Sequence, residues 1–343
     1  MSDELRKTRR GLLAAAAGTS AVGAAGCLDV TTPADLAAAT HPQGHVGYLV
    51  GVDWARERRD QVVFLDARQE RLFREERIRG ARLVSIDRIG RRSSSEDGLI
   101  PDTNGLADAL GDLGVARDTD VIVYGASVGA RVTRTVFALH ALGHAGDIHI
   151  LNGGMRAWTG RLGTGGWSAP TVREYEPEPD PSTWVTREWI ADRIGSFNAD
   201  GPGLIDVRVP EAYIAATGSP ALDERHERHG HVPGAVNVHW LGNIDGGMIA
   251  DPGELFERYT GGAGLSTEEP VVVYGDENVE ATQTWVTLRA IGFEDVRLYE
   301  GGFTEWANVD ADRGRYPVET GTTAVIETDG DAGVDDGGDF TCT

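Results

Sequence analysis

Short apolar runs alternate with longer segments of mixed polarity through most of the chain, and the same succession occurs twice. In the first half the apolar runs are residues 61–65 and 121–124, and in the second half they are residues 203–207 and 271–274. Runs of this length, bounded by polar or glycine-rich segments, predict buried strands. Because these strands alternate with predicted helices, we expect an α/β fold with mainly parallel sheets covered by helices on both faces.

The repeat is clearest between residues 121–158 and residues 271–306. Each copy begins with a four-residue apolar run that ends in Tyr, followed by Gly, a short loop and a predicted helix. Each copy then continues with another strand, a Gly-Gly pair and a Trp. A chain of 343 residues also exceeds the roughly 100–200 residues of a typical domain. We therefore expect two similar domains.

The predicted first domain spans residues 48–166 and the predicted second domain spans residues 183–320. The segment between them, residues 167–182, contains Glu-Pro-Glu-Pro-Asp-Pro and is predicted to be an extended linker. The second copy is longer than the first, and the polar segment 217–230 is the expected position of the insertion. Residues 321–343 are rich in Gly, Asp and Thr, which predicts an acidic disordered tail.

The amino-terminal region has the pattern of an export signal. Arg9 and Arg10 precede a weakly apolar stretch of Ala and Gly that ends just before Cys27. Paired arginines before such a stretch are typical of twin-arginine signals, and small residues before a cysteine are typical of a lipoprotein cleavage site. We expect a signal over residues 1–26, a lipid on Cys27 and a tether over residues 27–47, which would hold the protein on the outer face of the cell membrane. A cleaved signal without lipid and a retained membrane anchor are the alternatives.

The charge of the chain limits its partners. The formal net charge is -22, with 54 acidic and 32 basic residues, and Lys7 is the only lysine. Phosphate groups are contacted mainly by clustered Lys and Arg, so nucleic acid is excluded as an expected partner. An acidic surface with almost no lysine is typical of proteins from salt-loving, haloarchaeal-like organisms, where it keeps the surface hydrated. Contact with a membrane is expected only through the lipid.

Several motifs of the second half occur together in one known family. They are Trp189, Asp206-Val207-Arg208, Pro210-Glu211-Ala212-Tyr213, Gly230-His231-Val232-Pro233-Gly234-Ala235, Tyr274, Ala281 and Gly301-Gly302-Phe303-Thr304-Glu305-Trp306. In this order, and echoed in the first half, they resemble the tandem rhodanese-domain sulfurtransferases of the thiosulfate and 3-mercaptopyruvate type. The resemblance covers residues 48–319 and implies two tandem rhodanese-like domains.

The resemblance implies a catalytic loop directly after the apolar run 271–274. In the family this loop carries a cysteine whose sulfur is surrounded by backbone N–H groups, which lower the pKa of the thiol and stabilise a persulfide. The family spacing places the nucleophile at Gly275, with Asp206 and Arg208 as supporting residues. Because glycine has no sulfur, the persulfide route is closed at this position and loss of sulfurtransferase activity is predicted.

The rest of the loop also departs from the family pattern. It consists of Asp276, Glu277, Asn278, Val279 and Glu280, where the thiosulfate enzymes have basic residues and the mercaptopyruvate enzymes have small neutral ones. Ala212 stands where members of the family hold a substrate-binding arginine. One carboxylate about 4 Å from an anionic donor costs about 1 to 4 kcal/mol. We therefore expect the loop to repel an anionic donor, although less so in molar salt.

The matching loop of the first half, residues 125–130, offers further candidates. Ser127 is a potential nucleophile, but no His and Asp are placed by motif to activate it, so capping of the following helix is the preferred interpretation. Arg131 and Arg134 lie near the start of that helix and are candidates to hold a small anion. The preferred alternative is that they are solvated or bind the acidic second domain.

Three histidines and one thiol remain. His226, His229 and His231 lie in an acidic loop, but His231 belongs to the Gly-His-Val-Pro-Gly-Ala turn of the family and the spacing fits no known closed metal site. We therefore expect neither a metal nor another cofactor. Acidic neighbours should raise the pKa of Cys342, so an inert tail thiol is predicted.

These observations favour an exported, lipid-anchored rhodanese-like protein that has lost its nucleophile and acts as a binding or scaffold module. Its expected partner is an unidentified protein or a small sulfur-containing anion. The first alternative is an active sulfurtransferase that takes sulfur from thiosulfate or 3-mercaptopyruvate through a thiol other than position 275, either Cys342 or a thiol of a partner. The second alternative is a sensor whose loops bind an anion.

Overall fold

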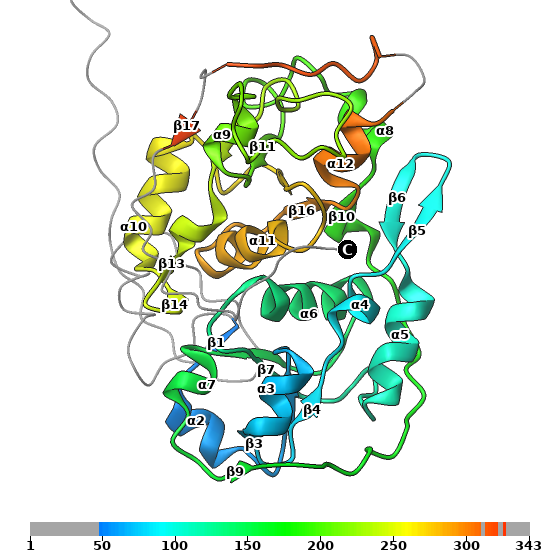
Figure 1. The fold of residues 1–343 in the computed structure, drawn as a ribbon, viewed down its shortest axis with the longest axis vertical. Coiled ribbons are helices and arrows are strands. Elements are labelled where there is room, and N and C mark those ends of the chain that lie inside the picture. The colour runs from blue at the N-terminus through cyan, green and yellow to red at the C-terminus, as the bar shows by residue number, and fades with distance from the viewer. Residues whose placement is uncertain (1–47, 310–312, 322–324, 327–343) are drawn as a thin grey trace, which may run out of the picture.

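The computed structural model describes residues 48–309, 313–321 and 325–326 of the chain. Figure 1 shows two α/β domains, the first in blue to green and the second in green to orange, with one domain above the other. Each domain contains a parallel sheet flanked by helices, which confirms the predicted fold class.

The sheet of the first domain has five parallel strands in the order β1-β8-β7-β2-β4. The strands are β1 (Leu49–Val50), β2 (Val63–Asp66), β4 (Arg82–Leu83), β7 (Val121–Tyr124) and β8 (Ile148–Leu151). The helices are α2 (Val52–Glu57), α3 (Glu70–Glu75), α4 (Ile86–Ile89), α5 (Thr103–Asp112), α6 (Ala130–Ala141) and α7 (Gly154–Ala157). Two antiparallel pairs lie outside the sheet: β3 (Arg77–Ile78) with β9 (Leu162–Gly163), and β5 (Arg92–Ser95) with β6 (Gly98–Pro101).

The sheet of the second domain has six parallel strands in the order β10-β16-β15-β11-β12-β17. The strands are β10 (Trp184–Val185), β11 (Gly203–Asp206), β12 (Val236–Val238), β15 (Val271–Tyr274), β16 (Val296–Tyr299) and β17 (Val325–Ile326). The α-helices are α8 (Arg187–Ala191), α9 (Pro210–Tyr213), α10 (Pro252–Glu257), α11 (Ala281–Ala290) and α12 (Gly302–Ala307). Short 3-10 helices cover Pro181–Thr183 and Trp240–Asn243, a π-helical turn covers Arg258–Gly262, and β13 (Ile244–Asp245) pairs with β14 (Met248–Ile249) as a hairpin.

The apolar pattern located the central strands well. β7 and β15 have the predicted bounds, while β2 begins two residues later than the run 61–65 because Gln61 closes a turn onto Arg58. No helix or strand occurs from residue 164 to residue 180, and the 3-10 helix Pro181–Thr183 begins inside the segment 167–182 that was predicted to be an extended linker. The tail prediction needs a correction, since Val325–Ile326 pair with β12 as a sixth strand.

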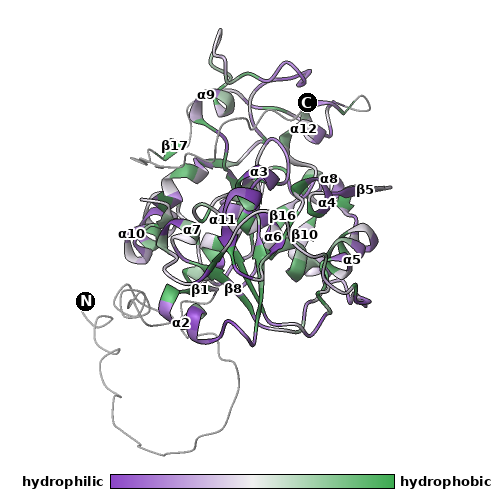
Figure 2. Cartoon of the chain, turned by 60° about the horizontal axis from the view of Figure 1, so that its bottom comes forward, coloured by the Kyte–Doolittle hydropathy of each residue, from purple (hydrophilic) through white to green (hydrophobic). Residues whose placement is uncertain are grey.

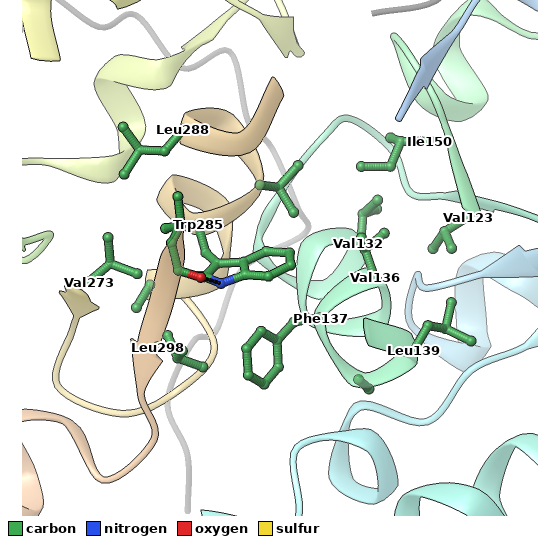
Figure 3. Close-up of a cluster of buried hydrophobic side chains, with 14 of the residues drawn as sticks. Val123, Val132, Val136, Phe137, Leu139, Ile150, Val273, Trp285, Leu288 and Leu298 are labelled. Atoms are coloured by element: carbon green, nitrogen blue, oxygen red, sulfur yellow. Dashed lines mark hydrogen bonds between the residues drawn. The ribbon is translucent and has the colours of Figure 1, made fainter. Parts of the chain in front are cut away.

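The two domains share one continuous hydrophobic cluster. Helix α6 of the first domain packs against α11 of the second, and Phe137 and Trp285 meet edge to face with ring centroids 5.3 Å apart (Figure 3). The Thr133 and Thr282 hydroxyls form a buried hydrogen bond of 2.9 Å across the same contact. Several interior strands are apolar in the hydropathy colouring, whereas many outer loops are polar (Figure 2). The burial of both helices against each other therefore joins the halves into one core.

The described residues do not include the predicted signal and tether, nor Cys27 and Cys342. Within the described ranges, none of the helices combines the length and the apolar character needed to cross a bilayer.

Candidate functional site

The loop 275–280 connects β15 to α11 at the carboxyl end of a strand that lies inside the second sheet. Crevices at this edge of parallel sheets are the usual ligand sites of α/β proteins. The loop is held from the side by Gly302, which has φ +62°, and a Cβ there would lie 2.6 Å from the Asp276 carbonyl oxygen. The next N–H groups along the chain donate to the loop: Phe303 to Gly275 O at 2.8 Å and Thr304 to Asp276 O at 2.9 Å. The Gly-Gly pair of the repeat thus permits the close approach that fixes the loop.

Gly275 itself is buried but has room for a side chain. A Cβ at this position would meet Glu277 O and Val207 Cγ2 at 3.4 Å, which is ordinary van der Waals contact. At the matching Gly125, a Cβ would lie only 2.8 Å from Val132 Cγ2. The second loop therefore retains space for a small side chain that the first loop lacks, while the assignment of Gly275 as the former nucleophile position stays a prediction.

The predicted supporting residues Asp206 and Arg208 are brought together directly beside this loop. Arg208 donates through Nε and Nη2 to both carboxylate oxygens of Asp206, and also through Nη2 to Gly230 O at 2.6 Å. Its Nη1 donates to Asp276 Oδ1 at 3.3 Å. Burial alone would lower the pKa of Arg208, but the Asp206 carboxylate outweighs it and the pKa is raised. The guanidinium is thus a fixed cation whose hydrogen bonds hold one wall of the site.

Two of the three loop carboxylates lie against arginines, but Arg208 and Arg225 also pair with Asp206 and Asp223, so the expected repulsion of an anionic donor stays a prediction. Asp276 faces Arg208, and Glu277 contacts Arg225 at 2.7 Å and Arg92 of the first domain at 3.2 Å. Burial raises the pKa of Asp276, although Arg208 opposes the shift. Burial likewise raises the pKa of Glu280, which is the N-cap residue of α11. The loop therefore keeps an acidic character that Arg92, Arg208 and Arg225 offset only in part.

Asn278 connects the loop to the first domain. Its amide nitrogen donates to Glu300 Oε1 at 2.5 Å and to Gly90 O at 3.2 Å. Glu300 in turn forms a two-point ion pair with Arg134, at 2.7 and 3.1 Å, and both of these side chains are fully buried. This confirms the interpretation that Arg134 binds the acidic second domain. Arg134 is therefore not available to hold a free anion.

The acidic loop 217–230 places two side chains at the site. Arg225 pairs with Glu277, and His226 Nε2 lies 3.0 Å from Thr304 Oγ1 and 3.7 Å from Asp276 Oδ1. Burial lowers the pKa of His226 to about 4, so the ring is neutral near pH 7. His231 points elsewhere, stacking on Tyr213 with ring centroids 3.7 Å apart. In the described part of the chain, no three His, Cys, Asp or Glu side chains are grouped as metal ligands.

Several residues near the site were not identified from the sequence. One is Arg225, which comes from the insertion 217–230. Another is Arg92, which comes from the first domain, and the third is Glu300, which follows β16. No motif marked these residues. The predicted role of Ser127 as a helix cap is wrong, because α6 begins after Gly129 without a side-chain cap and Ser127 Oγ has no partner among the described residues.

The architecture and the loop define a protein with two rhodanese-like domains. Residues 52–161 and 186–309 both match the rhodanese-like domain family. Over 226 residues the chain is 30% identical to the thiosulfate sulfurtransferase of Corynebacterium glutamicum, covering 64% of this chain and 72% of that protein. Over 263 residues it is 26% identical to the thiosulfate sulfurtransferase of Pseudomonas aeruginosa, covering 72% and 89%.

Solved structures agree with this classification. The crystal structure of SseA from Escherichia coli, described as a 3-mercaptopyruvate sulfotransferase with the rhodanese fold, superposes with a TM-score of 0.61 at 25% identity. The match covers 74% of this chain and 98% of that one. The chain therefore belongs to the rhodanese family.

Proposed function

We propose that this rhodanese-family protein does not transfer sulfur through a persulfide at position 275 and that it serves as a binding or scaffold module. The observation that carries the proposal is the glycine at the first position of the loop 275–280, in a sequence whose two cysteines are Cys27 and Cys342. A persulfide needs a thiolate fixed beside the N–H groups of the loop. Neither cysteine belongs to the two domains, so neither is part of this loop.

The binding role is supported by the persistence of the site around the missing side chain. The Asp206–Arg208 pair, the hydrogen bonds from Phe303 and Thr304, and the space at Gly275 are all present. The ligands in this proposal are a small sulfur-containing anion or a protein partner that contacts the loop. The sequence of the leader further supports attachment to the outer face of the cell membrane through a lipid on Cys27.

Thiocyanate formation from thiosulfate and cyanide tests the loss of activity. We expect the wild type and Cys342→Ala to match a protein-free blank. Gly275→Cys serves as the positive control, because the 3.4 Å contacts admit its Cβ, and we expect it to gain turnover. Turnover by the wild type that disappears in Cys342→Ala would instead support the alternative in which the tail thiol carries sulfur.

The anchor is tested in the native host. The wild type and Cys27→Ala are compared by membrane fractionation. We expect the wild type in the membrane fraction and Cys27→Ala in the medium or the soluble fraction. Equal membrane association of both proteins would contradict a lipid on Cys27.

A further inference from the structure

The loop of the first domain borders a hollow that contains no acidic side chain. The hollow has a volume of about 20 Å³, and its lining includes Arg68, Ala126, Ser127 and Arg131. A space of this size admits a single atom as large as a water molecule. The absence of carboxylates from its lining contrasts with the net charge of -22 of the whole chain. We propose that this hollow binds a small oxyanion of sulfur or phosphorus, which inserts one oxygen atom between the two arginines.

Arg68 lines this hollow, and its Nη1 lies outside the Asp66 ion pair. Its Nε and Nη2 bind the Asp66 carboxylate, and Nη2 also donates to Glu76 O at 2.7 Å. Its Nη1 makes no ion pair with a described residue, although Tyr124 lies near the guanidinium. The side chain is only 8% exposed, so the geometry of its guanidinium is fixed before a ligand arrives. A fixed guanidinium N–H binds an oxyanion without the loss of side-chain entropy that an exposed arginine incurs.

The second domain shows which group such an arginine binds. Arg208 is the counterpart of Arg68 and makes the same contacts with its own Asp, but its Nη1 donates to Asp276 Oδ1 at 3.3 Å. The counterpart of Asp276 in the first domain is Ala126, which has no polar side chain. The second loop thus supplies its own carboxylate, whereas the first loop leaves the same position open to an external anion.

Two further groups favour an anion in this place. Ser127 is 3% exposed, and its Oγ has no hydrogen-bond partner in the described part of the chain although it carries a donor proton. The twelve-residue helix α6 starts at Ala130, so the positive end of its dipole faces the loop. Arg131, in the first turn of α6, has no ion pair with a described residue and lies at the rim of the hollow. Arg68, Arg131 and Ser127 therefore line a space that no carboxylate lines, and Asp66 is the one acidic partner of Arg68 in the described part of the chain.

Equilibrium dialysis with radiolabelled sulfate or phosphate, in buffer of constant chloride concentration, tests the site. We expect saturable binding of one anion per chain. Ala126→Asp should abolish it by giving Arg68 an internal carboxylate, as in the second domain. Arg131→Gln should weaken it by about tenfold through loss of one charged donor. Arg71→Gln is the matched control, because it removes a charge from α3 outside the hollow, and it should bind like the wild type.

Urea unfolding of each variant establishes that it is folded, so that loss of binding is not loss of structure. The proposal is overturned if the wild type shows no saturable binding, or if folded Ala126→Asp binds as well as the wild type. It is also overturned if Arg71→Gln weakens binding as much as Arg131→Gln, since net charge alone would then explain the effect. Equal competition by chloride and sulfate would contradict an oxyanion site. None of these results depends on the thiocyanate assay of the second loop.

Discussion

The ion pair between Arg134 and Glu300 is expected to be a large contributor to the stability of the two-domain unit. Both side chains have no exposed surface, and they join α6 of the first domain to the end of β16 in the second. Glu300→Gln keeps the shape of the side chain but leaves a buried guanidinium without a counter-charge. Removal of one partner from a buried pair costs about 3 to 5 kcal/mol. We expect Glu300→Gln and Arg134→Met each to lower the free energy of unfolding by this amount.

The double variant separates the pair from its surroundings. Arg134→Met with Glu300→Gln removes both charges, so its cost should be smaller than the sum of the single costs by about 2 kcal/mol or more. Urea is the suitable denaturant because it is uncharged, and Trp fluorescence reports on Trp285 at the interface. Exposed Arg71→Gln, which breaks a surface pair with Glu75, should cost only about 0.5 kcal/mol.

Salt concentration provides the second criterion. At 1 M salt the Debye length is about 3 Å, so the cost of Arg71→Gln should vanish while the cost of Glu300→Gln persists. If Glu300→Gln lowers the free energy of unfolding by less than about 1 kcal/mol, the ion pair is not the large contributor expected here, because a buried unpaired charge destabilises a protein by more than that. Additive single costs in the double variant would also refute the reasoning, since the two charges would then act independently.

Two further predictions concern the loops. Gly275→Ala should change the free energy of unfolding by less than about 1 kcal/mol. Gly125→Ala should lower it by about 1 to 3 kcal/mol, because its Cβ collides with Val132. Equal effects of the two variants in urea unfolding would contradict the conclusion that only Gly275 has room for a side chain. The pKa of His226 is about 4 in the folded protein and about 6.5 when unfolded, so its contribution is complete above the unfolded value and is lost as the pH falls toward the folded one. The stability of the wild type relative to His226→Gln should therefore decline by on the order of 2 to 3 kcal/mol between these pH values, and parallel pH profiles of the two proteins would show that burial of the ring does not matter.

The sequence predicted those parts of the fold that depend on local pattern. β7 and β15 could be located because four consecutive apolar residues in a central parallel strand are buried on both faces. The close approach at Gly302 could be anticipated from the Gly-Gly pair that both copies share. β17 was missed because its two apolar residues, Val325 and Ile326, are too few to form a recognisable run.

The contacts that complete the candidate site could not be predicted in this way. Arg92 reaches Glu277 across 185 positions of sequence, and Arg134 reaches Glu300 across 166. Such pairs depend on how the two domains pack. Arg134 was expected to bind the second domain, but no motif identified Glu300 as its partner or marked Arg92. The sequence consequently shows the acidic residues of the loop but not the arginines that face two of them.

The packing of α6 against α11 has a consequence for how the duplicated halves depend on each other. A half expressed alone would turn Phe137 or Trp285, together with the apolar flank of its inner helix, toward water. Such a fragment should self-associate rather than behave as an autonomous unit. Neither copy can therefore change its inner helix independently, because a substitution on one helix alters the surface that the other helix must fit.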